Sequence, residues 1–89
     1  MIKVLLSPEA ETRFKKYSPT TKKRFIHSFR SLGRRKFSTL KRLPYSNLLV
    51  KNVGDYRLIL SMEPTSVIVV DILTKKKLAA ELRKSNLYY

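Results

Sequence analysis

Residues 48–73 read LLVKNVGDYRLILSMEPTSVIVVDIL, and this stretch decides the fold. It divides into three runs rich in apolar and β-branched side chains, at residues 48–53, 56–62 and 66–73. Only Gly54-Asp55 separates the first run from the second, and only Glu63-Pro64-Thr65 separates the second from the third. Because such runs favour strands and such short separators favour tight turns, the stretch predicts an antiparallel meander of three strands.

The turn at Gly54-Asp55 also predicts how the first two strands pair. A two-residue turn places Asn52 opposite Arg57. It likewise places Lys51 opposite Leu58. Side chains alternate between the two faces of a strand, so Arg57 and Lys51 should point in opposite directions. We expect helices to cover the apolar face and to leave Arg57 on the open face; the apolar face carries Tyr56, Leu58, Leu60 and Met62.

The N-terminal half predicts one strand and two helices. Residues 2–6 form a short apolar run that should join the meander as a strand. Serine followed by proline, at Ser7-Pro8 and again at Ser18-Pro19, is typical of a helix start. Apolar side chains recur at helical spacing after each start, and Gly33 is expected to end the second helix.

The remaining segments complete the expected fold. Residues 34–47 are basic and contain the helix breaker Pro44, which predicts an irregular connection. Residues 77–84 predict a short closing helix with Leu78 and Leu82 on one side. The expected order is β-α-α-β-β-β-(α). This is an α+β fold in which a helical hairpin packs on a small, mainly antiparallel sheet of four strands, and residues 1–89 suffice for one domain.

Charge is the strongest signal in the composition. Lys and Arg number 20 against six Asp and Glu, which gives a formal net charge of +14. Thirteen of these cations lie between Glu11 and Asp55, where there is no acidic residue. Such crowding destabilises a folded chain unless an anion offsets it, and phosphate backbones are the usual anions. The sequence therefore predicts a surface for nucleic acid or the ribosome, against the alternative of a solubilising surface.

Several classes of protein are disfavoured. No apolar run approaches the roughly 20 residues that cross a bilayer, and the N-terminus does not resemble a signal peptide. We therefore expect a cytoplasmic protein without a membrane partner. The chain has no cysteine and one histidine, so it offers no metal-ligand cluster and implies no cofactor. That histidine, His27, falls opposite the apolar stripe of its helix and is expected to face solvent.

Three stretches resemble a known family. Residues 53–60, VGDYRLIL, are similar to the hairpin pattern ending in Gly-Asp-Tyr-Arg of the RelE/ParE superfamily of toxins from toxin–antitoxin pairs. Residues 40–45, LKRLPY, look like the Leu-x-Gly-Leu segment of that family, and residues 67–73, VIVVDIL, match its apolar last strand. The order of elements also resembles the family, so the resemblance covers nearly the whole chain.

The resemblance implies a ribosome-dependent messenger RNA endonuclease that needs no metal. In such enzymes the ribose 2′-OH attacks the adjacent phosphate, and basic side chains stabilise the developing charge. Arg57 matches the family's functional arginine and Lys76 best matches another, so both are predicted to be catalytic. The family's two further basic positions fall on Val50 and Asn52, and its C-terminal Tyr or His falls on Leu82. These three residues are a departure from the family.

Further cations are predicted to hold RNA phosphates without reading sequence. They are Arg34, Arg35, Lys36, Lys41, Arg42, Lys75 and Lys77. The alternative for each group is a solvated charge run. Tyr88 and Tyr89 could supply the missing C-terminal side chain only if the tail folds back.

Three functions remain open at this point. The first is a toxin that cuts messenger RNA on the ribosome, favoured by the high charge and by Arg57. The second is a noncatalytic, ParE-like toxin that inhibits gyrase or another protein, favoured by the uncharged Val50 and Asn52. The third is a basic nucleic-acid-binding module without a toxin role. For either toxin we expect an acidic antitoxin partner, a segment of which folds on binding.

Overall fold

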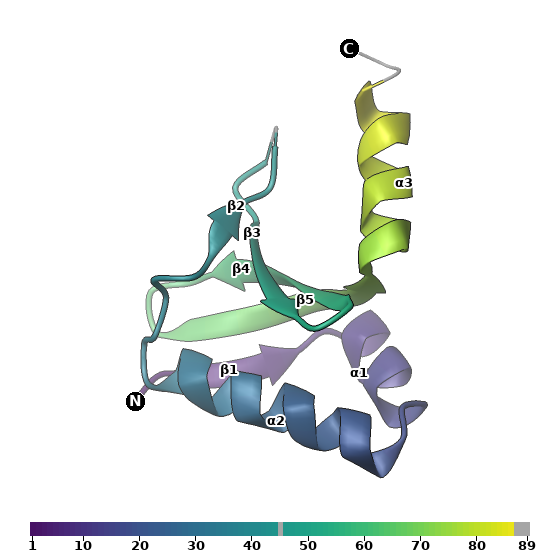
Figure 1. The fold of residues 1–89 in the computed structure, drawn as a ribbon. Coiled ribbons are helices and arrows are strands. Elements are labelled where there is room, and N and C mark those ends of the chain that lie inside the picture. Colours follow the sequence, from purple (N-terminus) through teal and green to yellow (C-terminus); the bar gives the residue numbers. More distant parts are fainter. Residues whose placement is uncertain (45, 87–89) are drawn as a thin grey trace.

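The computed structural model describes residues 1–44 and 46–86, the last two of these for their backbone alone. This part of the chain forms three helices and five strands (Figure 1). In chain order they are β1 (Lys3–Leu6), α1 (Pro8–Lys15), α2 (Pro19–Gly33), β2 (Lys41–Arg42), β3 (Leu49–Val53), β4 (Tyr56–Met62), β5 (Ser66–Thr74) and α3 (Lys75–Asn86). The expected α+β class is confirmed.

Both predicted helix starts are confirmed. The Ser7 side chain accepts a hydrogen bond from the backbone N–H of Ala10 at 3.1 Å, and Ser18 accepts one from Thr21 at 3.3 Å. Each serine satisfies an N–H group that the helix itself leaves unpaired. A proline follows each serine inside the first turn, where its missing N–H costs nothing.

The strands lie in the order β1-β5-β4-β3-β2. β1 is parallel to β5, and the other neighbours are antiparallel. The predicted register between β3 and β4 is confirmed, because Asn52 pairs with Arg57 and Lys51 pairs with Leu58. A β-bulge between Ile59 and Leu60 interrupts the pairing of β4 with β5, which the sequence did not predict.

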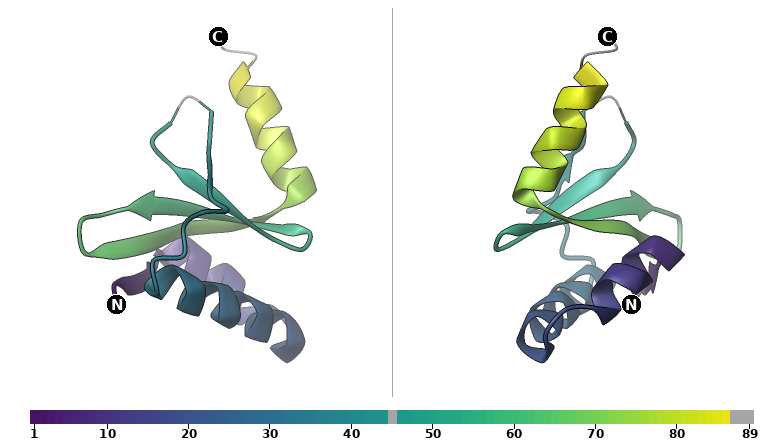
Figure 2. Two further views of the ribbon diagram at one scale, coloured as in Figure 1. Left: turned by 60° about the vertical axis from the view of Figure 1, so that its left-hand side comes forward. Right: turned by 90° about the vertical axis from the view of Figure 1, so that its right-hand side faces the viewer.

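Helices α1 and α2 cover one face of the sheet, as expected, while α3 stands on the other side (Figure 2). Under the two helices lies the main core, whose fully buried members include Phe25, Leu58, Leu60, Val67 and Val69. Aromatic rings from both helices and from β4 pack at one end of this core. The ring centroid of Tyr56 lies 5.1 Å from those of both Tyr17 and Phe25.

The second face of the sheet is partly covered, so the expectation of an open face is only partly right. Val50, Ile59 and Leu73 form a second, smaller cluster there. Side chains from the β2–β3 loop and from α3 pack against it, among them Leu43 and Leu78. α1 and α2 already cover the first face of the sheet. The apolar side chains of α3 therefore pack on the second face.

Three further expectations need correction. Residues 34–47 are not wholly irregular, because Lys41 and Arg42 pair with β3 as a short edge strand. The sheet therefore has five strands and not four. The last helix begins at Lys75 and not near Lys77, so it follows β5 without a loop.

α2 ends at Gly33, as predicted, but not through the conformation of this glycine. Gly33 is the last helical residue and is buried against the N-terminal strand, where its carbonyl accepts a hydrogen bond from the N–H of Ile2 at 3.0 Å. The left-handed conformation that ends the helix belongs to Arg35, with φ of 61°. Arg35 and Lys36 donate their N–H groups to Leu32 and Ser31, which closes the helix in a Schellman motif.

Candidate functional site

The turn between β3 and β4 is the centre of the candidate site. Gly54 has φ of 57°, a left-handed conformation that glycine adopts without the steric cost a side chain adds. The carbonyl of Asp55 accepts a hydrogen bond from the N–H of Lys75 at 2.7 Å. The start of α3 is therefore fixed against this turn.

Arg57 lies just beyond the turn, at the end of the second face. Its side chain is half-buried and folds back along the hairpin. Nη1 donates to the carbonyl of Gly54 and to that of Tyr56, both at 2.8 Å. Both bonds use one nitrogen of the guanidinium, which has five N–H donors. The hairpin thus orients Arg57 without using its whole hydrogen-bonding capacity.

Lys75, Lys76 and Lys77 form the first turn of α3. The Thr74 side chain caps this helix by accepting a hydrogen bond from the N–H of Lys77 at 3.1 Å. Cations at a helix N-terminus are unfavourable, because the positive end of the helix dipole lies there. Lys77 is paired with Glu81 at 3.4 Å. Lys75 and Lys76 are exposed and, with Asp55 and Thr74, line a shallow depression of about 300 Å³.

Arg24 is a residue of this site that the sequence analysis missed. It is exposed on α2, yet its guanidinium lies against the turn from the helix side. A Cβ on Gly54 would clash with its Nη2. Arg24 and Arg57 therefore approach the same glycine, one from α2 and one from β4. The only sequence signal was the place of Arg24 on the flank of its helix, and that alone did not indicate the turn.

A cavity of about 470 Å³ lies on the second face, between the sheet, the β2–β3 loop and α3. Its floor is apolar and includes Ile59, Val70 and Leu73, and Leu78 and Leu82 of α3 form one wall. Charged groups lie at its rim, where Arg13 pairs with Asp71 at 2.7 Å. The cavity therefore lies next to the end of the second face that carries the cations of the turn.

Comparison with known proteins identifies the architecture. A chain in the crystal structure of the RelBE2 toxin–antitoxin complex from Mycobacterium tuberculosis superposes with a TM-score of 0.72 at 18% identity, over 82% of this chain and 96% of that one. A chain in the intact Escherichia coli RelBE complex gives 0.72 at 11%, over 83% and 96%. The chain has a RelE-like fold.

A third structure agrees with the first two. A chain of the RelB–RelE complex from Methanococcus jannaschii gives a TM-score of 0.66 at 17% identity, over 86% of this chain and 96% of that chain. A scan of protein-family models and a search of curated proteins return no match to this sequence. Identities this low establish the RelE-like fold, which confirms the fold implied by the sequence resemblance.

Within this RelE-like fold, the three departures noted in the sequence fall on the second face or at its end. Val50 is buried in the apolar cluster of the second face, and Asn52 is exposed beside Arg57. Leu82 lines the apolar cavity. The positions that the resemblance expects to be basic or acid–base groups are therefore apolar or neutral. Tyr88 and Tyr89 lie outside the described residues.

The second cationic segment follows α2. Arg34, Arg35, Lys36 and Lys41 are all exposed. The positive φ of Arg35 turns the chain after the helix, within this run of cations. These side chains are available to an anion, and their assignment to phosphate binding stays a prediction.

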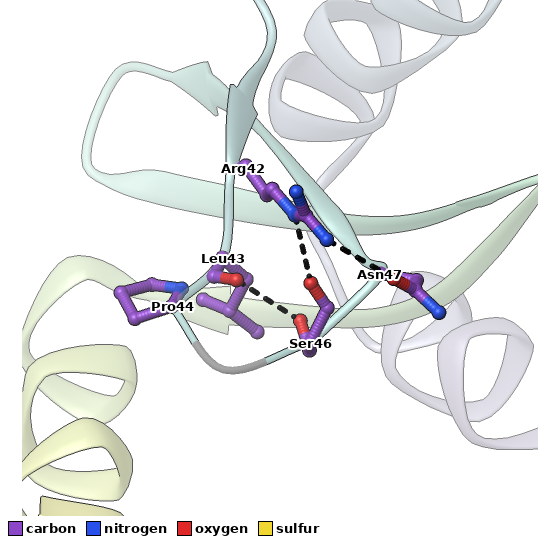
Figure 3. A pocket seen from close by; sticks show the side chains of 5 residues that line it. All are labelled: Arg42, Leu43, Pro44, Ser46 and Asn47. Atoms are coloured by element: carbon purple, nitrogen blue, oxygen red, sulfur yellow. Dashed lines mark hydrogen bonds between the residues drawn. The ribbon is translucent and has the colours of Figure 1, made fainter.

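Arg42 differs from its neighbours because its guanidinium is hydrogen-bonded within the β2–β3 loop. Nε donates to the carbonyl of Ser46 at 3.0 Å, and Nη2 donates to Oδ1 of Asn47 at 3.2 Å (Figure 3). The Ser46 hydroxyl donates in turn to the carbonyl of Leu43 at 3.1 Å. Arg42 therefore shapes the β2–β3 loop, and any contact with phosphate would be additional to this role.

One further candidate residue fits the expectation from the sequence. His27 is exposed on α2, as predicted. The described residues hold no group of three His, Asp or Glu side chains that could bind a metal ion. No helix among them has the length and apolar character needed to cross a membrane. Burial, together with the neighbouring Tyr56, raises the pKa of Tyr17 above its ordinary value of 10.0.

Proposed function

We propose that this chain is the toxin of a toxin–antitoxin pair and that it cuts messenger RNA on the ribosome without a metal. The observation that supports the proposal is the gathering of Arg24, Arg57, Lys75 and Lys76 around the Gly54-Asp55 turn of a RelE-like fold. The cations come from three elements that are separate in the sequence. A phosphate bound there would meet positive charge from more than one side.

The chemistry assigned to this site is transfer of a phosphoryl group within the RNA. The ribose 2′-hydroxyl gives its proton to water as its oxygen attacks the adjacent phosphorus. The bond from phosphorus to the 5′-oxygen of the next nucleotide breaks, and that oxygen takes up a proton from water, which leaves a 2′,3′-cyclic phosphate. Negative charge builds on the phosphate oxygens in the transition state. Arg57 is assigned to stabilise this charge with its planar guanidinium, and Lys76 to stabilise it as a point charge.

The proposed partner is an acidic antitoxin. All three similar structures are of toxin–antitoxin complexes. A chain of net charge +14 suits an acidic segment that neutralises it and becomes ordered on binding. Co-expression with a small acidic neighbouring reading frame should yield a tight complex and restore growth. If the purified chain does not bind the product of that neighbouring reading frame, this part of the proposal is wrong.

A second function is supported by the apolar cavity. Val50 and Leu82 give the second face an apolar character that suits contact with a protein more than contact with phosphate. A noncatalytic toxin that inhibits gyrase or another protein would use this surface. It would need Arg57 only as one polar contact at the edge.

One experiment separates the two functions. The purified chain is added to a reconstituted translation reaction, and primer extension maps the ends of the messenger RNA; supercoiling by gyrase is measured in parallel. We expect new RNA ends that depend on ribosomes and no effect on supercoiling. Intact RNA together with blocked supercoiling would favour the noncatalytic toxin.

A further inference from the structure

The outer face of α2 carries a stripe of basic side chains, of which Arg34 alone is among the cations already predicted to hold RNA phosphates. Lys23, His27, Arg30 and Arg34 follow one another at spacings of four, three and four residues. All four are exposed, and Arg34 is the C-cap residue. These spacings keep them on one side of the helix, opposite the side that buries Phe25 and Leu32.

Nothing within the helix offsets this charge. α2 contains no Asp or Glu. Two acidic side chains near the helical hairpin pair with cations outside the stripe, since Glu11 pairs with Lys15 and Asp71 pairs with Arg13. Arg30 and Arg34 are like charges four residues apart, and the negative end of the helix dipole offsets part of their repulsion. The exposed charge of the stripe does not serve the packing of α2, and an external anion would neutralise it.

The chemistry of the stripe indicates which anion it suits. Single-stranded nucleic acid is usually held by exposed aromatic rings on which bases stack. The aromatic residues of α2, Phe25 and Phe29, pack into the core, and the exposed large apolar residues of the described chain are Met1, Leu5 and Ile26. A surface of cations without stacking partners fits a phosphate backbone whose bases are already paired.

The shape of the stripe agrees with such a ligand. Arg34 follows Lys23 by eleven positions, which corresponds to roughly 17 Å along an α-helix. The cations are carried on a rigid rod, which suits the regular spacing of phosphates along a duplex. Beside the stripe, Lys23, Arg24 and His27 line a hollow of about 360 Å³ with Val53. This hollow could admit a phosphate group at the end of the stripe near Gly54.

We propose that the outer face of α2 binds the phosphate backbone of double-helical RNA by charge, without reading its sequence. The choice of RNA over DNA rests on the proposed function, whereas the charge and geometry of the stripe do not. α2 lies on the side of the sheet opposite α3 (Figures 1 and 2). Its Lys23 end lies near the Gly54 turn, where Arg24 lines the same hollow, and the rest of the stripe contributes affinity but not cleavage.

The test is a comparison of two full-length variants that each lose three charges. One is Lys23→Gln/Arg30→Gln/Arg34→Gln on the stripe. The control is Lys3→Gln/Lys15→Gln/Lys16→Gln, whose exposed side chains lie on β1 and α1. Circular dichroism confirms that both fold. Fluorescence anisotropy then measures binding to a duplex RNA, to a single-stranded RNA of the same length and to a duplex DNA, over a range of salt concentrations.

We expect the stripe variant to bind duplex RNA about 10- to 100-fold more weakly, with a log affinity against log salt slope shallower by about 2–3. The control should lose less than about threefold. Equal losses in both variants would overturn the proposal, because they would show that only net charge matters. Equal or tighter binding of single-stranded RNA, or of duplex DNA, would overturn the assigned ligand. Arg57→Ala, which loses one cation at the proposed cleavage site, should lose no more duplex RNA binding than the control variant, so failed cleavage and failed binding are told apart.

Discussion

The two faces of the sheet differ in how completely they are covered. Beneath α1 and α2, Leu58 and Leu60 are fully buried. On the other face, Val50 and Leu73 each keep 9% of their surface exposed, although they are the centre of the apolar cluster there. The first face contains a packed core. The second is covered by one helix and one loop, and it carries Arg57 at its end.

This difference assigns separate tasks to the two faces. A core without gaps provides most of the stability and determines which strands pair. A half-covered face can hold a ligand, because its side chains are fixed by the sheet but remain accessible. The account therefore predicts that substitutions on the first face act on stability and that those near Arg57 act on function.

The largest effect on stability is expected when two leucines, one on each face of the sheet, are replaced by alanine and compared. Leu58→Ala should lower the free energy of unfolding by about 3 kcal/mol, because it leaves a cavity in a closed core. Leu73→Ala should cost roughly 1–2 kcal/mol, since α3 can settle into the space. Chemical denaturation measures both. Equal losses would contradict the division between the faces.

A smaller effect is expected at the turn that joins β3 to β4. Gly54→Ala should cost about 1–2 kcal/mol, because a side chain is disfavoured at φ of 57°. The Arg24 side chain would also have to move away from the new methyl group. Arg24→Ala/Gly54→Ala removes that contact and keeps the unfavourable φ, so most of the loss should remain. Full recovery in the double variant would show that the contact, and not the backbone, requires glycine.

A substitution at the end of α2 is expected to raise the stability of the fold instead of lowering it. Arg35→Gly should stabilise the fold by about 1 kcal/mol, because glycine adopts the left-handed conformation of Arg35 without steric cost. Arg35→Ala is the matched control, since it removes the same charge and keeps the Cβ. Thermal unfolding compares the two. A gain of the same size in both would indicate that relief of charge repulsion is responsible.

The smallest effect concerns Tyr17 in the aromatic cluster of the covered face. Its pKa is raised, first by burial and then by Tyr56, so the folded protein keeps a proton that the unfolded chain releases above about pH 10. Unfolding therefore becomes easier as the pH rises from that value through the folded pKa. Denaturation at increasing pH should show a steeper loss of stability in the wild type than in Tyr17→Phe. Identical slopes would contradict the raised pKa.

Local signals in the sequence predicted much of the fold. Ser7, Ser18 and Gly54 each determine a local conformation through their own chemistry, so two helix starts and one register could be derived without a structure. The apolar alternation of β4 then indicated which face the helices cover. The RelE-like resemblance rested on the same hairpin.

Features that depend on distant contacts could not be derived in this way. β2 has only two residues and exists because β3 offers it an edge. Gly33 was expected to end α2 through its backbone freedom, whereas the left-handed position belongs to Arg35, and a Cβ on Gly33 would make only ordinary contacts with Ile2 and Val4. The approach of Arg24 to the turn depends on how α2 crosses the sheet. No pattern within α2 encodes that crossing.

The most direct test of the account compares the two basic side chains on opposite faces of the hairpin. Arg57→Ala and Lys51→Ala each remove one cation near the turn, but Lys51 points to the helix side, where its Nζ lies 3.4 Å from the Thr39 hydroxyl. The rate of messenger RNA cleavage during translation is measured for both by primer extension. We predict a loss of about 100- to 1,000-fold for Arg57→Ala and little change for Lys51→Ala. Equal rates in both variants and the wild type would contradict the assignment of Arg57 as a catalytic residue.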